Sequence, residues 1–322
     1  MKILVLPNIS QENKQKIVDA FPQLDIEFDT QKDVTQEKIN SADIVVGNPH
    51  KGISLYNENL KALFLNSAGS DTYVKEGVLH PNTKLTNASG SYGKAIAEHT
   101  IGMILMINKN LKTFVLHMQQ HKWQNVPQGK EIAGSTVAIV GLGDLGYELA
   151  KKIKVFGCHI IGVKRRVSEV PEYIDELYTT KDLDEVLKRA DFVVLALPHS
   201  NETYHIMNKE RLMMMKKDAV LVNIGRGSAV ETEALISVLN EGHLYGVCLD
   251  VVEEEPLNEN SPLWDMDRVM ITPHCSGGFK WQSVQNYYTD LVISNLNHFL
   301  NDEPLENEVD FVTGYRKVIK YK

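Results

Sequence analysis

Short apolar runs alternate with amphipathic stretches along the first hundred residues. Four runs have the length and apolar character of buried strands, namely Ile3–Leu6, Ile26–Phe28, Ile44–Val46 and Leu63–Leu65. Three stretches between them are patterned as helices, namely Gln11–Phe21 with Ser10 as a candidate N-cap, Glu37–Ser41 and Glu58–Ala62. Strands that alternate with helices predict a doubly wound parallel sheet.

One long helix is predicted next, between Lys94 and Trp123. Its apolar side chains recur at helical spacing, namely Ile96, Met103, Ile104, Ile107, Leu111, Phe114, Val115 and Met118. A helix of this length can bridge two lobes, pack along an interface or lie in a core, and the pattern does not distinguish these roles.

The alternation then resumes more regularly. Six further strands are predicted, at Thr136–Val140, Ile160–Val163, Phe192–Leu197, Val220–Ile224, Gly246–Leu249 and Val269–Ile271. A helix follows at Ser283–Leu300, and the polar tail after it has too few apolar residues to fold alone, so it has to pack onto another part of the chain. The pattern predicts an α/β protein with two doubly wound parallel-sheet domains.

Composition excludes several classes of protein. The chain has 322 residues, 43% hydrophobic and 24% charged, which is typical of a globular protein. Its net charge of −8 argues against nucleic-acid binding, which requires phosphates to be neutralised. No apolar run is long enough to cross a membrane, and Ile3–Leu6 is too short for a secretory signal. Cys158, Cys248 and Cys275 form neither a disulfide framework nor a zinc motif, so we expect a cytoplasmic protein without a metal.

The strongest local signal is a glycine motif. Gly141, Gly143 and Gly146 form Gly-x-Gly-x-x-Gly directly after a predicted strand and at the start of a predicted helix. The first glycine permits a tight turn, the second lets the backbone approach a pyrophosphate, and the third lets the helix pack close to the strand. In this context the motif predicts a dinucleotide-binding site, with phosphates at the helix N-terminus.

The end of the following strand indicates which dinucleotide binds. An acidic residue about 20 positions after the motif would hold the ribose 2′-hydroxyl of NAD. Here the strand ends in Lys164, Arg165 and Arg166, without a carboxylate. Because arginine matches the oxygens of a 2′-phosphate, we expect NADP(H) to be favoured, with NAD(H) possible and a solvated basic turn as the alternative.

Three charged residues follow separate predicted strands. Arg226 comes after one strand, Glu255 after the next, and His274 after the last. Together they match the needs of 2-keto acid reduction, in which a cation binds the carboxylate and a proton is delivered to the new alkoxide. We expect Arg226 to bind substrate, His274 to act as acid and base, and Glu255 to orient His274 and favour its protonated form.

The ordered motifs Gly-x-Gly-x-x-Gly, Asn-x-x-Arg-Gly, Asp-Val-x-x-x-Glu-Pro and Pro-His resemble those of the D-2-hydroxyacid dehydrogenase family, over essentially the whole chain. The resemblance implies a Rossmann domain at residues 103–283, inserted into a flavodoxin-like substrate domain of residues 1–102 and 284–322. It also implies a homodimer, for which the helix at Lys94–Trp123 is a candidate interface.

The resemblance implies further site residues as well. Beside the glycine motif and the basic triplet, those expected at the cofactor are Ser70, Thr100, Asp144, Leu145, Leu197, Pro198, Thr203, Ile224, Gly225, Arg226, Asp250, His274, Ser276 and Gly277. Asp250 would hold the nicotinamide carboxamide. Those expected at the substrate are Asn66, Ser67, Ala68, Gly69, Ser70, Tyr92, Arg226, His274 and Trp281. Lys164, where the family usually has an acid, and Asp71, where it often has a small residue, depart from the pattern.

The substrate is expected to be a small 2-keto acid such as glyoxylate, hydroxypyruvate or a short aliphatic one. Phosphoglycerate dehydrogenase is the alternative within the family, but a phosphorylated substrate favours an arginine cluster, and only Lys75 and Lys94 are near. The chain also has no length for the extra regulatory domain of many such enzymes. Formate dehydrogenases have glutamine where Glu255 stands. A dinucleotide-sensing corepressor remains an alternative that is not an enzyme.

Overall fold

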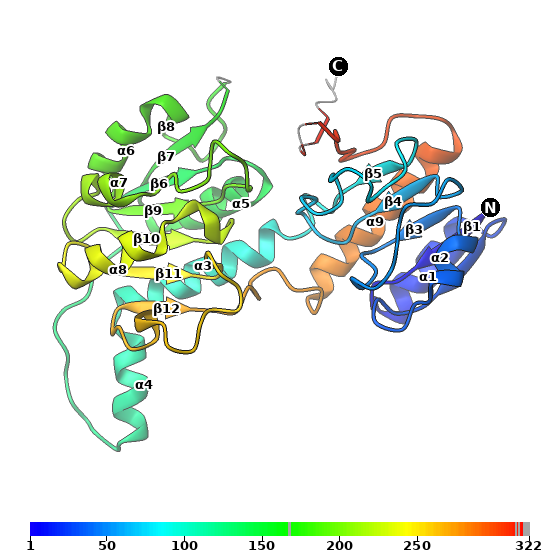
Figure 1. Ribbon diagram of the computed structural model, residues 1–322. Coiled ribbons are helices and arrows are strands. Elements are labelled where there is room, and N and C mark those ends of the chain that lie inside the picture. Colours follow the sequence, from blue (N-terminus) through cyan, green and yellow to red (C-terminus); the bar gives the residue numbers. More distant parts are fainter. Residues whose placement is uncertain (167–168, 313, 315, 318–322) are drawn as a thin grey trace. The chain divides into compact units, whose positions relative to one another are not determined.

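The described residues form two compact units. The computed structural model describes residues 1–166, 169–312, 314, 316 and 317. The first unit combines Met1–Tyr92 with Gly278–Lys322, and the second comprises Gly93–Gly277 (Figure 1). The first unit is therefore built from two separate stretches of the chain.

The unit boundaries differ from those expected at 102/103 and 283/284. The first expected boundary falls inside α3 (Gly93–Asn108), which belongs entirely to the second unit because its buried face, including Ala97 and Ile104, packs with the core of that unit. The second boundary lies between Gly277 and Gly278, before the expected position at 283/284. Phe279 belongs to the first unit, because its ring packs against that of Tyr288 with centroids 5.1 Å apart.

The first unit contains a five-stranded parallel sheet in the order β2-β1-β3-β4-β5. This is the flavodoxin-like order that the family resemblance implies. The strands are β1 (Lys2–Val5), β2 (Asp25–Phe28), β3 (Ile44–Val46), β4 (Ala62–Phe64) and β5 (Lys84–Thr86). The helices are α1 (Gln11–Ala20), α2 (Gln36–Ser41) and α9 (Gln282–Leu300). Ser10 caps α1 as expected, since its hydroxyl accepts the N–H of Asn13.

The second unit contains a seven-stranded parallel sheet in the order β12-β11-β10-β9-β6-β7-β8. Counted from β6, this is the Rossmann order 3-2-1-4-5-6 with a seventh strand added, and the direction of winding reverses between β6 and β9. The strands are β6 (Thr136–Val140), β7 (His159–Lys164), β8 (Glu176–Thr179), β9 (Phe192–Leu195), β10 (Val220–Asn223), β11 (Gly246–Leu249) and β12 (Val269–Ile271). The expected fold class is confirmed.

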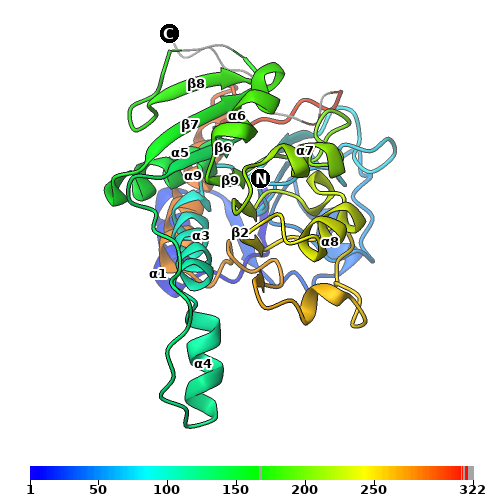
Figure 2. The ribbon, with the colours of Figure 1, turned by 90° about the vertical axis from the view of Figure 1, so that its left-hand side faces the viewer.

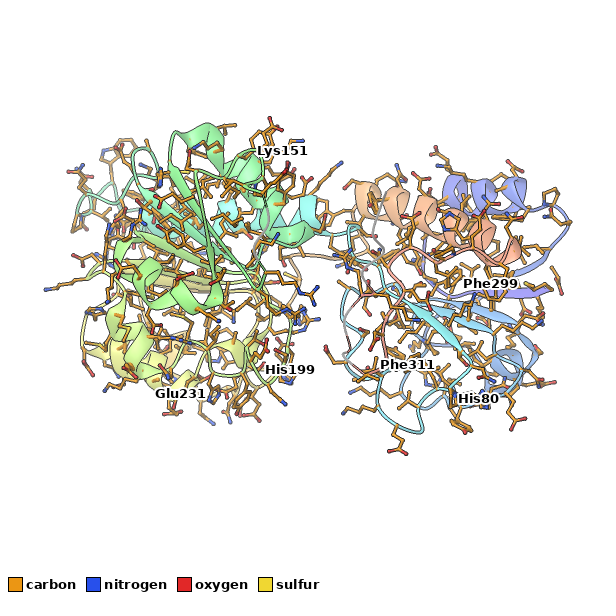
Figure 3. All side chains as sticks on the ribbon, turned by 90° about the horizontal axis from the view of Figure 1, so that it is seen from above. His80, Lys151, His199, Glu231, Phe299 and Phe311 are labelled. Carbon is orange, nitrogen blue, oxygen red and sulfur yellow. The ribbon has the colours of Figure 1, made fainter. Side chains whose placement is uncertain are left out.

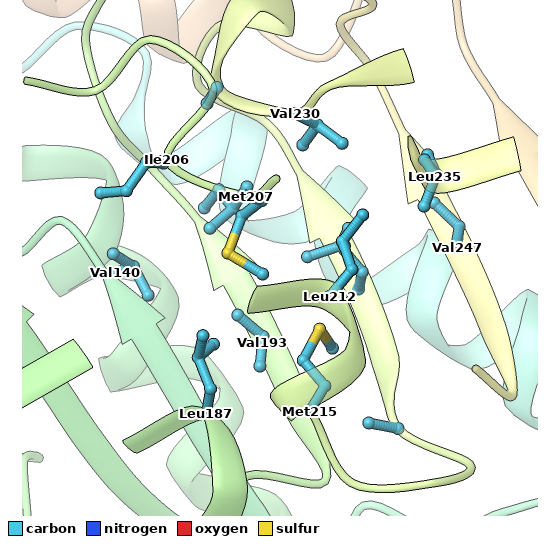
Figure 4. Packing of buried hydrophobic residues seen from close by; sticks show 14 of the residues in the cluster. Val140, Leu187, Val193, Ile206, Met207, Leu212, Met215, Val230, Leu235 and Val247 are labelled. Atoms are coloured by element: carbon cyan, nitrogen blue, oxygen red, sulfur yellow. The ribbon is translucent and has the colours of Figure 1, made fainter. Parts of the chain in front are cut away.

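Both faces of this sheet are covered, as a parallel sheet requires. Side chains alternate along β9, so that Val193 and Leu195 join one apolar cluster while Phe192 and Val194 join another. Figure 4 shows part of the first cluster, including Val193, Leu212 and Met215. Its helices are α6 (Leu183–Arg189), α7 (Lys209–Met214) and α8 (Thr232–Asn240), and the other face is covered by α3 and α5 (Asp144–Ile153).

The long helix predicted at 94–123 is wrong in one respect, because the structure divides it in two. α3 ends at Asn108, and α4 (Leu111–Gln119) begins after Asn110, whose φ of 54° lies in the left-handed region. That conformation cannot continue an α-helix. No residue of α4 is buried, and the helix extends away from the sheet of the second unit (Figure 2). The apolar spacing alone could not reveal this break.

Three other details differ from the expectation. Residues 58–62 are not helical, because a turn leads directly into β4 there. β5 and β8 were not predicted; β5 has three residues, and all four residues of β8 are half-buried. The polar tail after α9 packs onto the sheet of the first unit. Val309 is buried in an apolar cluster with Leu63 and Leu85, and Phe311 packs against this cluster (Figure 3). In the described part of the chain, the helices are too short or too polar to cross a membrane.

Candidate active site

The glycine motif lies at the carboxyl end of β6, next to the point where the sheet reverses direction. Gly141 has a φ of +106°, and a Cβ there would lie 2.5 Å from the carbonyl oxygen of Ala196 after β9. A Cβ on Gly146 would lie 2.0 Å from the carbonyl oxygen of Gly141. Both positions therefore require glycine, because a side chain would collide with backbone.

Gly143 has a different role. It is the N-cap of α5, has no side-chain cap, and a Cβ there would have no atom within 4 Å. Open space therefore lies directly before the free N–H groups of a helix N-terminus, which is the arrangement that binds a pyrophosphate. The residues present fit a dinucleotide. Asp144 accepts the N–H of Gly93 at 3.1 Å, so its carboxylate contacts the start of α3, and Leu145 packs into the apolar cluster beneath.

The neighbouring strand ends carry the other residues expected at the cofactor. Lys164 is the last residue of β7, which pairs directly with β6, and Arg165 and Arg166 follow it as exposed residues. After β9, Leu197 lies against Gly141, and the hydroxyl of Thr203 donates to the carbonyl of Pro198 at 2.7 Å. The basic triplet is thus placed where the ribose of a dinucleotide would lie in this fold.

Arg226 is held by the end of β10. The side chain of the fully buried Asn223 donates to the carbonyl of Arg226 at 2.9 Å and accepts the N–H of Gly225 at 3.2 Å. Ile224 is also buried, and the half-buried guanidinium donates to the carbonyl of Gly225 at 2.8 Å. Asn223 therefore ties the turn to the strand end and orients the residue expected to bind the substrate carboxylate.

Glu255 and His274 form the expected pair. Nδ1 of His274 lies 2.8 Å from Oε2 of Glu255, although the residues are 19 positions apart. Both side chains remain accessible, with exposed fractions of 53% for His274 and 39% for Glu255. The backbone of His274 has a φ of 48°, and its N–H donates to the carbonyls of Asp250 and Thr272. Such a left-handed histidine is unusual and is held by its surroundings, as is common for residues at active sites.

Asp250 forms hydrogen bonds with residues on both sides of His274. Its carboxylate is 2% exposed and accepts hydrogen bonds from the hydroxyl of Thr272 at 2.6 Å, from the N–H of Cys275 at 3.1 Å, and from the N–H and hydroxyl of Ser276. A buried carboxylate needs this many donors because it has lost its hydration. Nε2 of His99, on α3, lies 3.0 Å from the hydroxyl of Thr272, which in turn donates to the carboxylate of Asp250.

One residue expected at the cofactor, Thr100, makes a different contact. Thr100 is fully buried, and its hydroxyl donates to the carbonyl of Ile96 on the preceding helical turn, as in an ordinary helix core. The ligand atoms of His99, Asp250 and Cys275 lie within 4.8 Å of one another, yet the oxygens of Asp250 already accept the hydrogen bonds given above. Gly277 is the last residue of the second unit.

The first unit positions the loop expected to bind the substrate carboxylate. Asn48 and Asn66, which follow β3 and β4, hydrogen-bond each other's backbone N–H groups through their side chains, at 2.7 Å and 2.9 Å. The hydroxyl of Ser67 donates to the carbonyl of Gly69 at 2.7 Å. The side chain of Asn87 donates to the carbonyl of Ala68 at 3.0 Å. The loop is therefore held in one conformation by neighbouring strand ends.

The remaining substrate candidates differ in their exposure. Ser70 is buried, and its hydroxyl donates to the carbonyl of Gly314 in the C-terminal segment at 3.2 Å. The hydroxyl of Tyr92 donates to the carbonyl of Asn66, and burial raises the pKa of Tyr92 far above its usual range, so it stays neutral. Trp281 is 58% exposed at the start of α9.

The comparisons with known proteins agree with this geometry. Residues 101–276 match the family described as D-isomer specific 2-hydroxyacid dehydrogenase, NAD binding domain. The chain belongs to this family. It is therefore an oxidoreductase that uses a nicotinamide dinucleotide, as the sequence predicted.

Individual relatives cover most of this dehydrogenase. A glyoxylate reductase of Thermococcus litoralis is 30% identical over 93% of this chain and 94% of its own length. A D-3-phosphoglycerate dehydrogenase of Methanocaldococcus jannaschii is 30% identical over 96% of this chain, which spans 59% of that longer protein. The crystal structure of an NADPH-dependent glyoxylate/hydroxypyruvate reductase from Sinorhizobium meliloti, in complex with NADP and sulfate, has a TM-score of 0.78 at 26% identity, covering 98% and 99% of the two chains.

Four residues of the candidate site were not predicted individually. Asn223, Thr272, His99 and Asn48 all hold another site residue in place through hydrogen bonds. The signal for Asn223 and Asn48 is a polar residue at the end of a buried apolar strand or two positions beyond it. His99 and Thr272 gave no comparable signal, because their partners are distant in the sequence.

Replacing Gly141 and replacing Gly143 by alanine should have different effects on stability and on NADPH binding. Gly141→Ala should destabilise the fold by roughly 1–3 kcal/mol, because its φ is unfavourable for alanine and its Cβ would meet backbone. Gly143→Ala should change the unfolding free energy by less than about 0.5 kcal/mol. Its affinity for NADPH should nevertheless fall by on the order of tenfold, about 1.4 kcal/mol, because the methyl group enters the space of the pyrophosphate.

Urea unfolding and NADPH fluorescence titration on both variants and the wild type measure these two effects separately. Unchanged NADPH affinity in Gly143→Ala would show that the pyrophosphate does not lie at this turn.

Proposed function

We propose that this dehydrogenase reduces small 2-keto acids to 2-hydroxy acids with NADPH. The observation that carries the proposal is the His274–Glu255 pair, which follows β11 and β12, together with Arg226 after the adjacent β10. The names of relatives support glyoxylate or hydroxypyruvate as the class of substrate.

The chemistry requires one proton and one hydride for each keto group. NADPH, when bound, supplies the hydride. Arg226 would bind the substrate carboxylate and polarise the carbonyl oxygen, which a planar guanidinium does better than an ammonium group. With Nδ1 of His274 donating to Glu255, Nε2 is left to give the proton to the oxygen that becomes the alkoxide. The reverse steps give oxidation of the 2-hydroxy acid.

The backbone N–H groups of the loop at 67–70, in the first unit, are proposed to bind a substrate carboxylate. The reciprocal Asn48–Asn66 bonds support this role, because a preorganised loop binds a small anion without the cost of ordering it. Lys75 and Lys94 are the cations nearest to these loops in the sequence, which favours an unphosphorylated substrate.

A substrate panel tests the proposal. Consumption of NADPH is measured with glyoxylate, hydroxypyruvate, pyruvate, 2-ketoisocaproate and phenylpyruvate, and 3-phosphoglycerate is tested with NADP in the oxidative direction. We expect turnover with the smallest keto acids. Turnover with 3-phosphoglycerate alone would favour the function named for the Methanocaldococcus jannaschii relative, and tight NADPH binding without any turnover would favour a dinucleotide sensor.

His274→Ala is the matched catalytic variant for this panel. It should lose at least about 10²-fold in kcat, the usual contribution of a general acid, while its Kd for NADPH stays near that of the wild type. His159→Ala, on β7 and paired with Glu176 instead, should retain activity. Near-normal turnover by His274→Ala would remove His274 from the mechanism.

NADPH is proposed as the preferred cofactor on the strength of the basic triplet. Replacing Lys164 with Asp and Arg165 with Ser should lower the ratio of kcat/KM for NADPH to that for NADH. A charged hydrogen bond contributes about 1.5–3 kcal/mol, so the ratio should fall by roughly ten- to a hundredfold. Lys151→Asp, which changes an exposed cation on α5, serves as the control. An unchanged ratio would show that the triplet is a solvated turn.

A homodimer is proposed through α4. Leu111, Val115 and Met118 of this helix are exposed, and Trp123 just beyond it is completely exposed. An apolar surface of this kind on one helix is typical of a protein interface. Replacing Val115 and Met118 with Glu should halve the mass seen by sedimentation velocity, whereas Val155→Glu, at another exposed apolar position, should leave it unchanged. A wild-type chain that sediments as a monomer would contradict the proposal.

A further inference from the structure

A second histidine–glutamate pair lies beside the first and has no role in the chemistry described above. Nε2 of His205, in the segment after β9, contacts Oε1 of Glu253, in the loop after β11. Oε2 of the same carboxylate accepts the N–H of Thr232 at 3.1 Å, at the first turn of α8. One carboxylate thus joins three segments that are distant in the sequence.

The pair is partly withdrawn from solvent. The exposed fractions are 28% for the His205 side chain and 30% for the Glu253 side chain. Burial by itself would raise the pKa of Glu253, but the hydrogen bonds from His205 and Thr232 outweigh it and leave the pKa lowered. Glu253 is therefore ionised at neutral pH and binds its partners as a charged acceptor.

His205 is itself rigidly placed. Its φ of 48° lies in the left-handed region, and its N–H donates to the carbonyl of Ser228 at 2.8 Å. Its ring stacks on that of Tyr204, with centroids 3.9 Å apart and an angle of 19° between the planes. Ser228 lies in the turn directly after Arg226. His205 is therefore anchored to the turn that carries the substrate-binding arginine.

The loop held by Glu253 is the one that carries Glu255. The N–H of Val252 donates to Oε1 of Glu255 at 3.3 Å, while Oε2 of Glu255 holds His274. The carbonyl of Val252 lies so close to Gly227 that a Cβ on this glycine would be 1.7 Å from the oxygen. A shift of Glu253 would thus move Val252, and with it the carboxylate that orients His274.

We propose that His205 and Glu253 form a positioning pair, which holds the loop at 252–255 so that Glu255 can orient His274. The inference rests on the proposed function and deepens it. An ordinary exposed ion pair would contribute little to stability and nothing to turnover. The difference here is that the carboxylate joins three segments, one of which carries Glu255, while another is bonded through the N–H of His205 to the turn after Arg226.

The first test compares two neighbouring glutamates. Glu253→Gln should lower kcat about tenfold, because small displacements of catalytic groups have large effects on rate. KM for the keto acid and Kd for NADPH should stay within about twofold. Glu254→Gln, the matched change at the exposed residue between Glu253 and Glu255, should behave as the wild type. Equal kcat values for the two variants would overturn the proposal.

Conservative replacement of the histidine adds a second readout. Glutamine can donate a hydrogen bond from a position similar to that of Nε2, whereas alanine cannot. His205→Gln should therefore recover a measurable part of the kcat lost in His205→Ala. Equal losses in the two variants would indicate that the ring is needed only for its packing on Tyr204.

A double-mutant cycle shows whether the pair acts through Glu255. Adding Glu253→Gln to Glu255→Gln should change kcat by less than about twofold, because the carboxylate that the pair positions is already gone. If the two losses multiply instead, Glu253 acts by another route and the proposal is wrong.

Hydrogen exchange separates this proposal from the proposed function. The amides of residues 252–255 should exchange faster in Glu253→Gln than in Glu254→Gln or the wild type, whether or not substrate is turned over. If the wild-type enzyme reduces none of the keto acids, the proposed function fails, but faster exchange would still support the structural half of the inference. Unchanged exchange would overturn it.

Discussion

The parallel pairing of β10, β11 and β12 is the constraint on which the candidate site depends. Because these strands run side by side in one direction, their carboxyl ends lie at the same edge of the sheet. The loops that follow them carry Arg226, Glu255 and His274. Parallel strands also require long crossover connections, which explains why residues of one site are so widely spaced in the sequence. A buried sheet with apolar side chains on both faces keeps these strand ends in register.

Close backbone contacts between the loops position the site residues further. The turn after Arg226 and the loop before Glu255 approach so closely that Gly227 has no room for a side chain. The carboxylate of Asp250 accepts hydrogen bonds from the N–H groups and hydroxyls around His274. The histidine is held in a left-handed conformation that it would rarely adopt alone. The residues on both sides of His274 are thus held by hydrogen bonds to a buried carboxylate. The His205–Glu253 contact joins the same loops, so His274, the proposed general acid, and the residues that hold it form one connected network.

The first unit follows the same rule with different residues. Its loop at 67–70, which is proposed to bind the substrate, comes after β4 and is tied to the ends of β3 and β5 through Asn48 and Asn87. The C-terminal segment returns to this loop, where the Gly314 carbonyl accepts the hydroxyl of Ser70. The polar tail therefore packs on the part of the unit most closely connected with the proposed chemistry. In both units, the positioning groups are amides and carboxylates at strand ends, where backbone polar groups need partners.

The sequence by itself determined the alternation of strands and helices, the glycine motif and the three charged residues after successive strands. These features are local, because they depend on side-chain periodicity and on glycine at fixed offsets. Only the tertiary structure decided the break at Asn110, the four groups that donate hydrogen bonds to the carboxylate of Asp250, and the contact between His205 and Glu253, which are 48 positions apart. Such contacts arise where separate loops pack together, and no local pattern records which polar residue will meet which. The helix prediction at 94–123 was wrong for the same reason, since apolar spacing continues through a residue whose backbone turns the chain.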